Sequence, residues 1–449
     1  MPRPARSART PKRAKRAKRE TRPRGHANKL PDIKPETPIT SLDLGMFEGR
    51  SASFAIEKVA KVVGFSPTFI RRVVGGKRTL SIQDVLRLLE QDAFAETFVP
   101  RSKVIRYLLE IEAVGKPGSI QVNRDGFSLK NECALKFLRA LPSESVQCVV
   151  TSTPYWGLRI YKDAKQVKWA DGADCVYGHE QTPEAFIRHS TELLHEVYRV
   201  LKIGGSVWWN VMDSFNTRTQ IRGSAVEALR AMQGKEKRGW KDYDCRRYSA
   251  GHAYLKDGEQ CLIPSRIAER ASRLGFYIKS VITWAKPSTL PEPQESRVSR
   301  NLEYVLHLTK RRTPIFNKSA YLNLPSSVGG RNNGWETAKL SDVWTLSTSS
   351  GRDGHGAQFP VALPARCIAL STAKNDLVLD PFVGAGNSGV AAVALDRKFI
   401  GVDISKEYLK TAQRKIMAAL TERRAVPLHA LADTVEAEVI DDPLSATQE

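Results

Sequence analysis

The sequence lacks several features that would place it in large protein classes. Its six cysteines include no C-x-x-C pair, which excludes a zinc ribbon and a disulfide framework and is typical of a reducing cytosol. It has no apolar run of about 18 residues, so we expect no membrane span. The basic start of the chain has no apolar segment of the kind found in secretory signals. We therefore expect a cytoplasmic protein.

Acidic residues are few compared with basic ones. The 449 residues include 70 Lys and Arg against 48 Asp and Glu, a formal net charge of +22. Such a charge favours a polyanionic partner, nucleic acid first. With 41% hydrophobic and 26% charged residues, the composition is that of a globular protein. At roughly 150 residues per domain, the chain is long enough for two or three folding units.

The charge is concentrated near the two ends of the sequence. Residues 1–34 contain thirteen Lys or Arg and two acidic residues, which is half of the net charge. Because this stretch has no apolar periodicity, we expect residues 1–40 to form a disordered basic arm that contacts nucleic-acid phosphates; a solubilising tail is the alternative. Residues 430–449 carry six acidic and no basic side chains, which predicts a solvated acidic tail over residues 426–449.

A helical module is expected over residues 41–117. The apolar pattern from residue 54 to residue 90 predicts three short helices. Ser66 is placed to cap the second, with Pro67 at its first helical position, and Ser81 to cap the third. A short glycine-containing turn before a basic helix resembles the helix-turn-helix of phage repressors. The alternative is a small bundle that only packs on its neighbour.

A nucleoside-binding pattern lies near the C-terminus, in DLVLDPFVGAGNSGVAAVALDRKFIGVDIS. A buried strand (377–379) ends at Asp380, a glycine-rich turn leads into a helix (387–396), and a second strand (399–402) ends in Asp403. This is half of a Rossmann-like sheet. The glycines also match G-x-G-x-x-G, so an NAD dehydrogenase is an alternative. However, the Asp380 charge would repel a pyrophosphate, whereas it suits the ammonium group of S-adenosylmethionine.

A second motif follows a buried strand at residues 146–150, which leads directly into Thr-Ser-Thr-Pro-Tyr-Trp. Together the two segments resemble the site-specific DNA amino-methyltransferases, which act on N4 of cytosine or N6 of adenine. In that family a strand ends in Asp, Asn or Ser followed by Pro-Pro-Tyr, and D-P-F-x-G-x-G binds the cofactor. Ser152, Pro154 and Tyr155 match this pattern, and Thr153 replaces the first proline. The motif order is that of the beta class, and the resemblance extends to residues 276–287, 295–310 and 354–366.

The resemblance implies a fold and a set of site residues. The fold is an α/β, Rossmann-like S-adenosylmethionine-dependent methyltransferase domain over residues 118–425, beside the N-terminal helical module. A helix over residues 183–200, a turn at Gly204–Gly205 and a strand over residues 206–210 are expected to form a further αβ unit of the same sheet. The polar, basic segment 216–258 is expected to form a mobile DNA-facing loop, with a disordered insertion as the alternative. Target-recognition elements are expected within residues 317–348. The implied catalytic residues are Ser152, Thr153, Pro154 and Tyr155. The implied cofactor-binding residues are Asp380, Phe382, Gly384, Gly386, Asp403, Phe359 and Glu132, with Asp125 as the alternative to the last.

The chemistry of the motif agrees with this family. The lone pair of an exocyclic base amine is delocalised into the ring, so a catalyst must hold the amine in place and accept hydrogen bonds from both of its N–H groups. The Ser152 hydroxyl and a nearby backbone carbonyl provide acceptors, and the Tyr155 ring can stack on an extruded base. This chemistry needs no metal. We interpret His179, His189 and His195 as structural, because their spacing indicates no acidic or cysteine partner with which they would bind a metal.

The identity of the strand-end residue predicts the product. In the family, Ser before Pro-Tyr goes mostly with N4 of cytosine and Asp with N6 of adenine, so Ser152 favours N4-methylcytosine in double-stranded DNA. N6-adenine methylation, RNA methylation and a DNA-binding regulator with an inactive fold are the alternatives. The resemblance also implies a prokaryotic, nucleoid-associated protein with a possible cognate restriction endonuclease.

Overall fold

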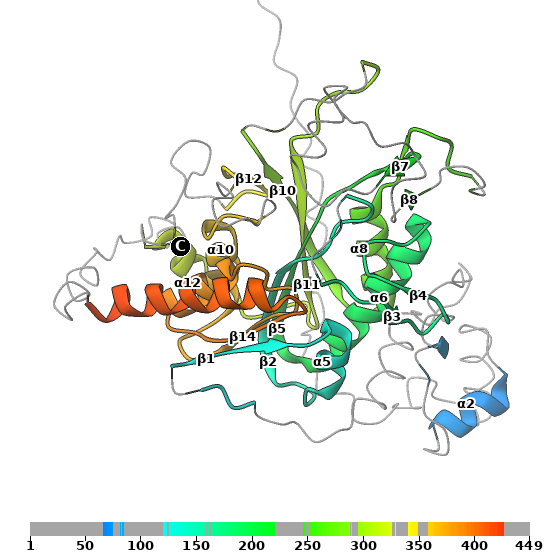
Figure 1. Cartoon of the computed structure of the whole chain (residues 1–449). Coiled ribbons are helices and arrows are strands. Elements are labelled where there is room, and N and C mark those ends of the chain that lie inside the picture. The colour runs from blue at the N-terminus through cyan, green and yellow to red at the C-terminus, as the bar shows by residue number, and fades with distance from the viewer. Residues whose placement is uncertain are drawn as a thin grey trace, which may run out of the picture. The chain divides into compact units, whose positions relative to one another are not determined.

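An eight-stranded sheet forms the centre of the described fold, in the order β1-β14-β13-β2-β5-β11-β10-β12 (Figure 1). Its strands are β1 (Phe127–Asn131), β2 (Val146–Ser152), β5 (Leu201–Val211), β10 (Tyr277–Ala285), β11 (Leu302–Thr309), β12 (Val343–Thr345), β13 (Leu377–Asp380) and β14 (Lys398–Asp403). Every neighbouring pair is parallel except the two that involve β11, which is antiparallel to both β5 and β10. The carboxyl ends of the other seven strands therefore lie along one edge of the sheet.

The structure is a computed structural model that describes residues 66–74, 81, 83–84, 120–123, 125–158, 160, 163–220, 246–247, 252, 254–287, 289, 295–325, 328, 340–348 and 358–425. The predicted basic arm, the acidic tail and most of the helical module lie outside these residues. No helix in the described part of the chain is both long enough and apolar enough to cross a membrane.

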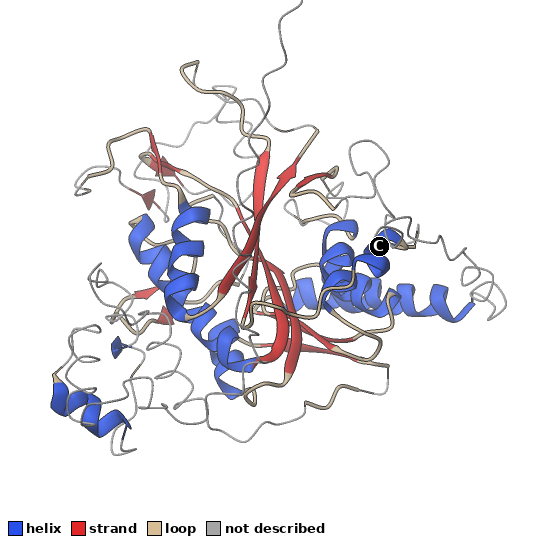
Figure 2. Ribbon diagram, turned by 180° about the vertical axis from the view of Figure 1, so that it is seen from behind, coloured by secondary structure: helices blue, strands red, loops and turns tan. Residues whose placement is uncertain are grey.

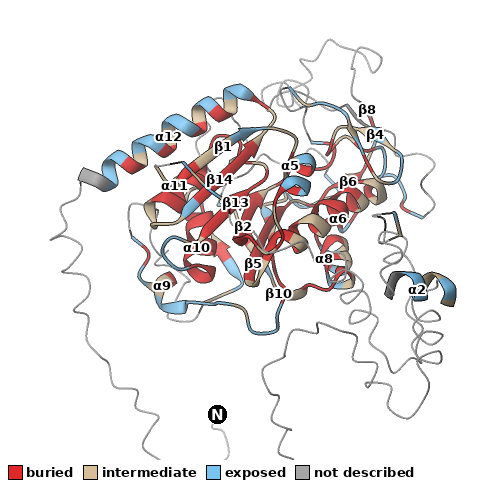
Figure 3. Ribbon diagram, turned by 90° about the horizontal axis from the view of Figure 1, so that it is seen from below, coloured by how far each residue is buried: buried red, intermediate tan, exposed pale blue. Residues whose placement is uncertain are grey.

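Helices cover both faces of the sheet (Figure 2). One face carries α5 (Ala134–Ala140), α6 (Pro183–Val200) and α8 (Ile263–Leu274). The other carries α9 (Lys318–Leu322), α10 (Ala362–Ser371), α11 (Asn387–Ala394) and α12 (Lys406–Ala425). Alternate side chains of β2 enter the two cores: Val149 packs with the first helix layer, and Cys148 and Val150 pack with the second. Burial of the central strands on both faces is visible in Figure 3 and is characteristic of parallel sheets. The predicted α/β, Rossmann-like fold is confirmed.

Most predicted element boundaries agree with the structure, and one prediction is wrong. The helix expected over residues 183–200 is α6, capped by the Thr182 side chain. The turn expected at Gly204–Gly205 instead lies inside β5, where the pairing with β2 becomes irregular. A Cβ on Gly205 would lie 2.7 Å from the Gln147 carbonyl oxygen, so glycine lets the two strands stay close here. The chain thus passes through the glycines without reversing direction.

Two helix caps in the N-terminal module agree with the sequence. Helix α2 (Pro67–Val74) begins after Ser66, whose Oγ accepts a hydrogen bond from the Phe69 amide at 3.2 Å. The Oγ of Ser81 accepts one from the Asp84 amide at 3.1 Å. The remainder of the predicted helix-turn-helix lies outside the described residues.

Short strands and a helix are found in and beside two predicted segments, the DNA-facing loop (216–258) and the target-recognition segment (317–348). Antiparallel pairs join β6 (Phe215–Asn216) to β9 (Glu259–Gln260) and β7 (Thr219–Gln220) to β8 (Arg246–Arg247). The segment from residue 317 to residue 348 includes α9 and β12, and β12 extends the main sheet by pairing with β10. The described residues at the two ends of this segment therefore belong to the fold built around the eight-stranded sheet. A further antiparallel pair, β3 (Val167–Lys168) and β4 (Asp174–Cys175), precedes α6.

Candidate active site

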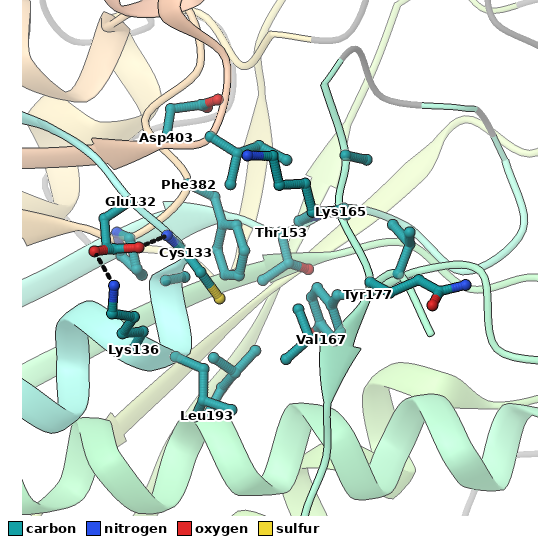
Figure 4. Close-up of a pocket in the computed structure, with 18 of the residues that line it drawn as sticks. Glu132, Cys133, Lys136, Thr153, Lys165, Val167, Tyr177, Leu193, Phe382 and Asp403 are labelled. Carbon is teal, nitrogen blue, oxygen red and sulfur yellow. Dashed lines mark hydrogen bonds and ion pairs between the residues drawn. The ribbon is translucent and has the colours of Figure 1, made fainter. Parts of the chain in front are cut away.

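A cavity of about 550 Å³ opens at the carboxyl ends of β1, β2, β13 and β14. Figure 4 shows Glu132 and Lys136 on one side of it and Lys165 and Tyr177 on the other, with Phe382 between them. Eight of the residues predicted from sequence line it: Glu132, Ser152, Thr153, Pro154, Tyr155, Phe382, Gly384 and Asp403. The predicted catalytic and cofactor motifs, more than 200 residues apart in sequence, therefore share one cavity.

A smaller cavity of about 40 Å³ continues from the first. Ser152, Phe382 and Gly384 line both cavities, and Phe359 and Gly386 line the smaller one. Ser152 therefore lies where the two spaces meet. Of the predicted site residues, only Asp380 and the alternative Asp125 line neither cavity.

The turn between β13 and α11 is held tightly against its surroundings. The Gly384 amide donates to Asp403 Oδ2 at 3.0 Å, and the Val383 amide donates to the Val402 carbonyl at 2.9 Å. Gly386 has a φ of +90°, and a Cβ there would lie 2.7 Å from backbone and side-chain atoms of Ala412. This turn therefore requires glycine at position 386 for both conformation and space.

We expect Gly386→Ala to lower the free energy of unfolding by about 2–4 kcal/mol, because an L-residue in this conformation is strained and the added methyl group overlaps α12. Chemical denaturation checks this. Gly258→Ala is a matched control, because Gly258 has a φ of +83° but open space around its Cβ position. An equal loss in the two variants would show that close packing on α12 contributes nothing.

Asp380 is buried at the end of β13, and hydrogen bonds inside the fold use both its carboxylate oxygens. Oδ1 accepts from Thr151 Oγ1 at 2.6 Å and from the Phe382 amide at 3.0 Å, and Oδ2 accepts from Ser388 Oγ at 2.5 Å. Burial raises the pKa of Asp380 to about 6 despite these bonds. In this structure Asp380 connects β2, the glycine turn and α11.

Asp403, at the end of β14, presents a carboxylate to the larger cavity. Besides the Gly384 amide, it accepts a hydrogen bond from the Ser405 amide at 2.8 Å. Burial raises its pKa to about 6, and these hydrogen bonds from amides partly offset that effect. Each carboxylate oxygen can accept more than one hydrogen bond, so acceptor capacity remains for a ligand hydroxyl.

Glu132 follows β1 and contributes a second acidic group to the cavity. Its carboxylate accepts from Lys136 Nζ at 2.8 Å and from the Cys133 amide at 3.1 Å. The Lys136 hydrogen bond is the largest cause that lowers the pKa of Glu132. Of the two acidic candidates near β1, Glu132 lines the cavity and Asp125 does not.

Polar side chains that belong to neither sequence motif surround Ser152. Asn210 on β5 lies opposite Ser152 in the sheet register, and its Nδ2 lies 3.2 Å from Ser152 Oγ and 2.8 Å from Tyr155 Oη. The Tyr155 phenol donates to Glu303 Oε2 on β11. The Tyr155 ring is only 9% exposed, so its hydroxyl end is directed into the fold.

The structure corrects the expectation that His189 has no acidic or cysteine neighbour. Its Nδ1 lies 2.8 Å from Glu180 Oε1 and 3.8 Å from Cys175 Sγ, and its ring stacks on Trp169 with centroids 4.1 Å apart. Burial raises the pKa of the Cys175 thiol to about 12, so the thiol stays protonated at neutral pH. Because Trp169 also lines the cavity, this cluster supports the cavity wall.

Comparison with known proteins identifies related sequences. Residues 146–414 match the family model N6_N4_Mtase, which describes a DNA methylase. The type II methyltransferase M.Cfr9I of Citrobacter freundii is 30% identical over 315 residues, which cover 69% of this chain and 93% of that protein. M.XycI of Xanthomonas campestris pv. cyanopsidis is 32% identical over 291 residues, covering 65% and 88%.

Two solved structures are also similar. The PvuII DNA methyltransferase (cytosine-N4-specific) shares 20% identity at a TM-score of 0.45, covering 69% of this chain and 95% of that one. The M1.HpyAVI–SAM complex shares 17% identity at a TM-score of 0.38, covering 65% and 98%.

Proposed function

The chain belongs to the DNA methylase family and is an S-adenosylmethionine-dependent methyltransferase of DNA amino groups. From this premise we propose that its product is N4-methylcytosine. The target would be a cytosine turned out of a specific sequence in double-stranded DNA. The observation that carries the proposal is the position of Ser152, where the predicted catalytic strand end meets both cavities.

The cavities fit the cofactor in size and chemistry. A volume of about 550 Å³ lies in the range of roughly 300–1,000 Å³ that small-molecule sites occupy. Asp403 would accept from the ribose hydroxyls, Phe382 would pack against the adenosyl group, and Glu132 would lie near the adenine amine. Gly384, Gly386 and Phe359 would surround the methionine part in the smaller cavity. Asp380 would act by holding the glycine turn in place.

The bound cofactor supplies a methyl group activated by a sulfonium. The residues of the chain then have to hold and polarise a weakly nucleophilic amine. Ser152 Oγ would accept a hydrogen bond from one N–H of the amine, and the backbone carbonyl of Thr153 or Pro154 would accept one from the other. Tyr155 would present its ring to the extruded base. Because the amine becomes more tetrahedral as its new bond forms, these acceptors would bind the transition state more strongly than the ground state.

The neutral Ser152 hydroxyl supports cytosine as the target, because Ser in the family pattern goes mostly with N4 of cytosine. Mass spectrometry of nucleosides from DNA methylated by the purified protein tests this. N4-methylcytosine is expected, and N6-methyladenine as the only product would overturn the cytosine assignment without affecting the family or the cofactor. Transfer to RNA but not DNA would overturn the DNA assignment, and no transfer to either would favour an inactive regulator.

We expect cofactor affinity to fall below about pH 6. The pKa of Asp403 is about 6 in the free protein, and the ionised carboxylate is the better acceptor and attracts the cationic cofactor. Binding should therefore lower this pKa, so that protons compete with the cofactor as the pH falls. By linkage, the dissociation constant should be about tenfold higher at pH 5 than at pH 7.5. Calorimetry at the two pH values measures this; Asp403→Asn should show little difference, and a flat wild-type profile would contradict the prediction.

The partners that we propose follow from the chemistry of the substrate. The net charge of +22 favours association with DNA through its phosphates. The similarity to type II methyltransferases supports a cognate restriction endonuclease and a prokaryotic, nucleoid-associated location. Protection of host DNA from cleavage by that nuclease would be the functional readout.

A further inference from the structure

We propose that Glu303 is a positioning residue that makes the Ser152 hydroxyl an obligate hydrogen-bond acceptor toward the target base. The inference rests on the proposed function, in that Ser152 contacts the reacting amine. It goes beyond that function because Glu303 lies on β11, a strand that carries none of the predicted site residues, and lines neither cavity.

The hydrogen bond between Tyr155 and Glu303 has one direction, from the phenol to the carboxylate. An ionised carboxylate only accepts hydrogen bonds. Glu303 is 7% exposed and forms an ion pair with Lys286, whose Nζ lies 3.0 Å from Oε1. In this ion pair the carboxylate is an acceptor, so Oε2 accepts the hydrogen bond from the Tyr155 phenol. The phenol has a single proton, which it donates to Glu303 and therefore cannot donate to Ser152.

The direction of the hydrogen bond between Ser152 and Tyr155 follows from this. Its Oγ lies 3.1 Å from Tyr155 Oη, and geometry alone allows either oxygen to be the donor. Since Tyr155 donates to Glu303, Ser152 must donate to Tyr155. Asn210 Nδ2 lies 3.2 Å from Ser152 Oγ but only 2.8 Å from Tyr155 Oη, so its two protons are directed to acceptors nearer than Ser152. This amide is oriented by Glu303 as well, because its Nδ2 lies 2.7 Å from Oε2.

Ser152 Oγ keeps acceptor capacity for the substrate. A serine hydroxyl has one proton and two lone pairs. The proton is directed to Tyr155, so at least one lone pair is left for the cavity. It matches the N–H of an exocyclic amine, whereas the keto oxygen at the equivalent position of thymine or guanine would face another acceptor. Glu303 thereby selects amino bases over keto bases, although it does not touch the base.

Glu303→Gln is the direct test, because glutamine keeps the shape but can also donate. Its amide could donate to Tyr155 Oη, and the phenol could then turn its proton toward Ser152. We expect the single-turnover rate of labelled methyl transfer to unmethylated genomic DNA to fall about 10- to 100-fold. Cofactor affinity should stay within about twofold. Glu422→Gln, at an exposed position on α12, is the matched control and should keep the wild-type rate.

A double-mutant cycle separates this role from a purely structural one. If Glu303 acts through Ser152, then adding Glu303→Gln to Ser152→Ala should slow transfer less than about threefold further. Fully additive losses would overturn the inference. Should Glu303→Gln fail to fold, Tyr155→Phe provides the second variant, because it removes the phenol that links Ser152 to Glu303. Its loss should also nearly disappear in the Ser152→Ala background.

The outcomes distinguish the inference from the proposed function. The transfer rate of each variant is compared with that of the wild type, whichever base is methylated. N6-methyladenine as the product would overturn the cytosine assignment, and the rates would still test the role of Glu303. An unchanged rate in Glu303→Gln would overturn the role of Glu303 alone. A wild-type chain that transfers no methyl group to either base would overturn both.

Discussion

Replacing Ser152 with alanine is expected to lower the rate of methyl transfer by about 100- to 1,000-fold, equivalent to about 2.7–4 kcal/mol, which is typical when one preorganised group at a reacting centre is lost. The reason is that Ser152 lies at the junction of the two cavities, where we propose that its Oγ accepts a hydrogen bond from the target amine. Its contribution should grow as the amine becomes tetrahedral, so the loss should appear in kcat more than in KM for DNA. Single-turnover transfer from labelled S-adenosylmethionine measures it.

Two controls make this result interpretable. Ser272→Ala alters an exposed serine on α8 and should leave the rate unchanged. Calorimetry should show nearly wild-type cofactor affinity for Ser152→Ala, because the cofactor contacts that we propose involve other residues. A folded Ser152→Ala protein with the wild-type rate would remove Ser152 from the catalytic site.

Residues that adjoin strand ends in local motifs could be predicted from the sequence. A short apolar strand followed by Asp-Pro and glycines marks the turn after β13, and Asp403 follows directly from the end of the next strand. The same logic identified Ser152 at the end of β2. These predictions need only local patterns, because the carboxyl ends of parallel strands necessarily meet at one edge of the sheet.

The partners of Ser152 could not be predicted in this way. Asn210 and Glu303 are 93 residues apart in sequence, and they become neighbours because β11 pairs with β5 in the antiparallel direction. Lys286 follows β10, which reaches Glu303 through the next strand pairing. Two of the segments that resemble the family contain Lys286 and Glu303, but nothing local indicates that their side chains meet. The sheet order carries that information.

The predicted role of Asp380 illustrates a different limit. Its position beside the glycine turn was correct, and the sequence pattern favoured contact with the cofactor ammonium group. Its side-chain partners Thr151 and Ser388 lie on different elements, and with the Phe382 amide they occupy its carboxylate within the fold. A charge at a strand end can therefore either face a ligand or organise the loop that does, and only the hydrogen-bond partners distinguish the two.

Asp403→Ala should weaken S-adenosylmethionine binding by about 1–3 kcal/mol, or about 5- to 150-fold in the dissociation constant, which is the range for a partly buried, charge-assisted hydrogen bond. The variant loses the acceptor for the ribose hydroxyls and also the carboxylate that anchors the Gly384 amide. Asp403→Asn keeps an acceptor oxygen of similar shape but no charge, so it should lose less affinity. Calorimetry of all three proteins compares these contributions, with thermal unfolding as the control for folding. If the folded alanine variant bound the cofactor as tightly as the wild type, the carboxylate at the end of β14 would not contact the cofactor. The ribose would then have to bind elsewhere than beside β14.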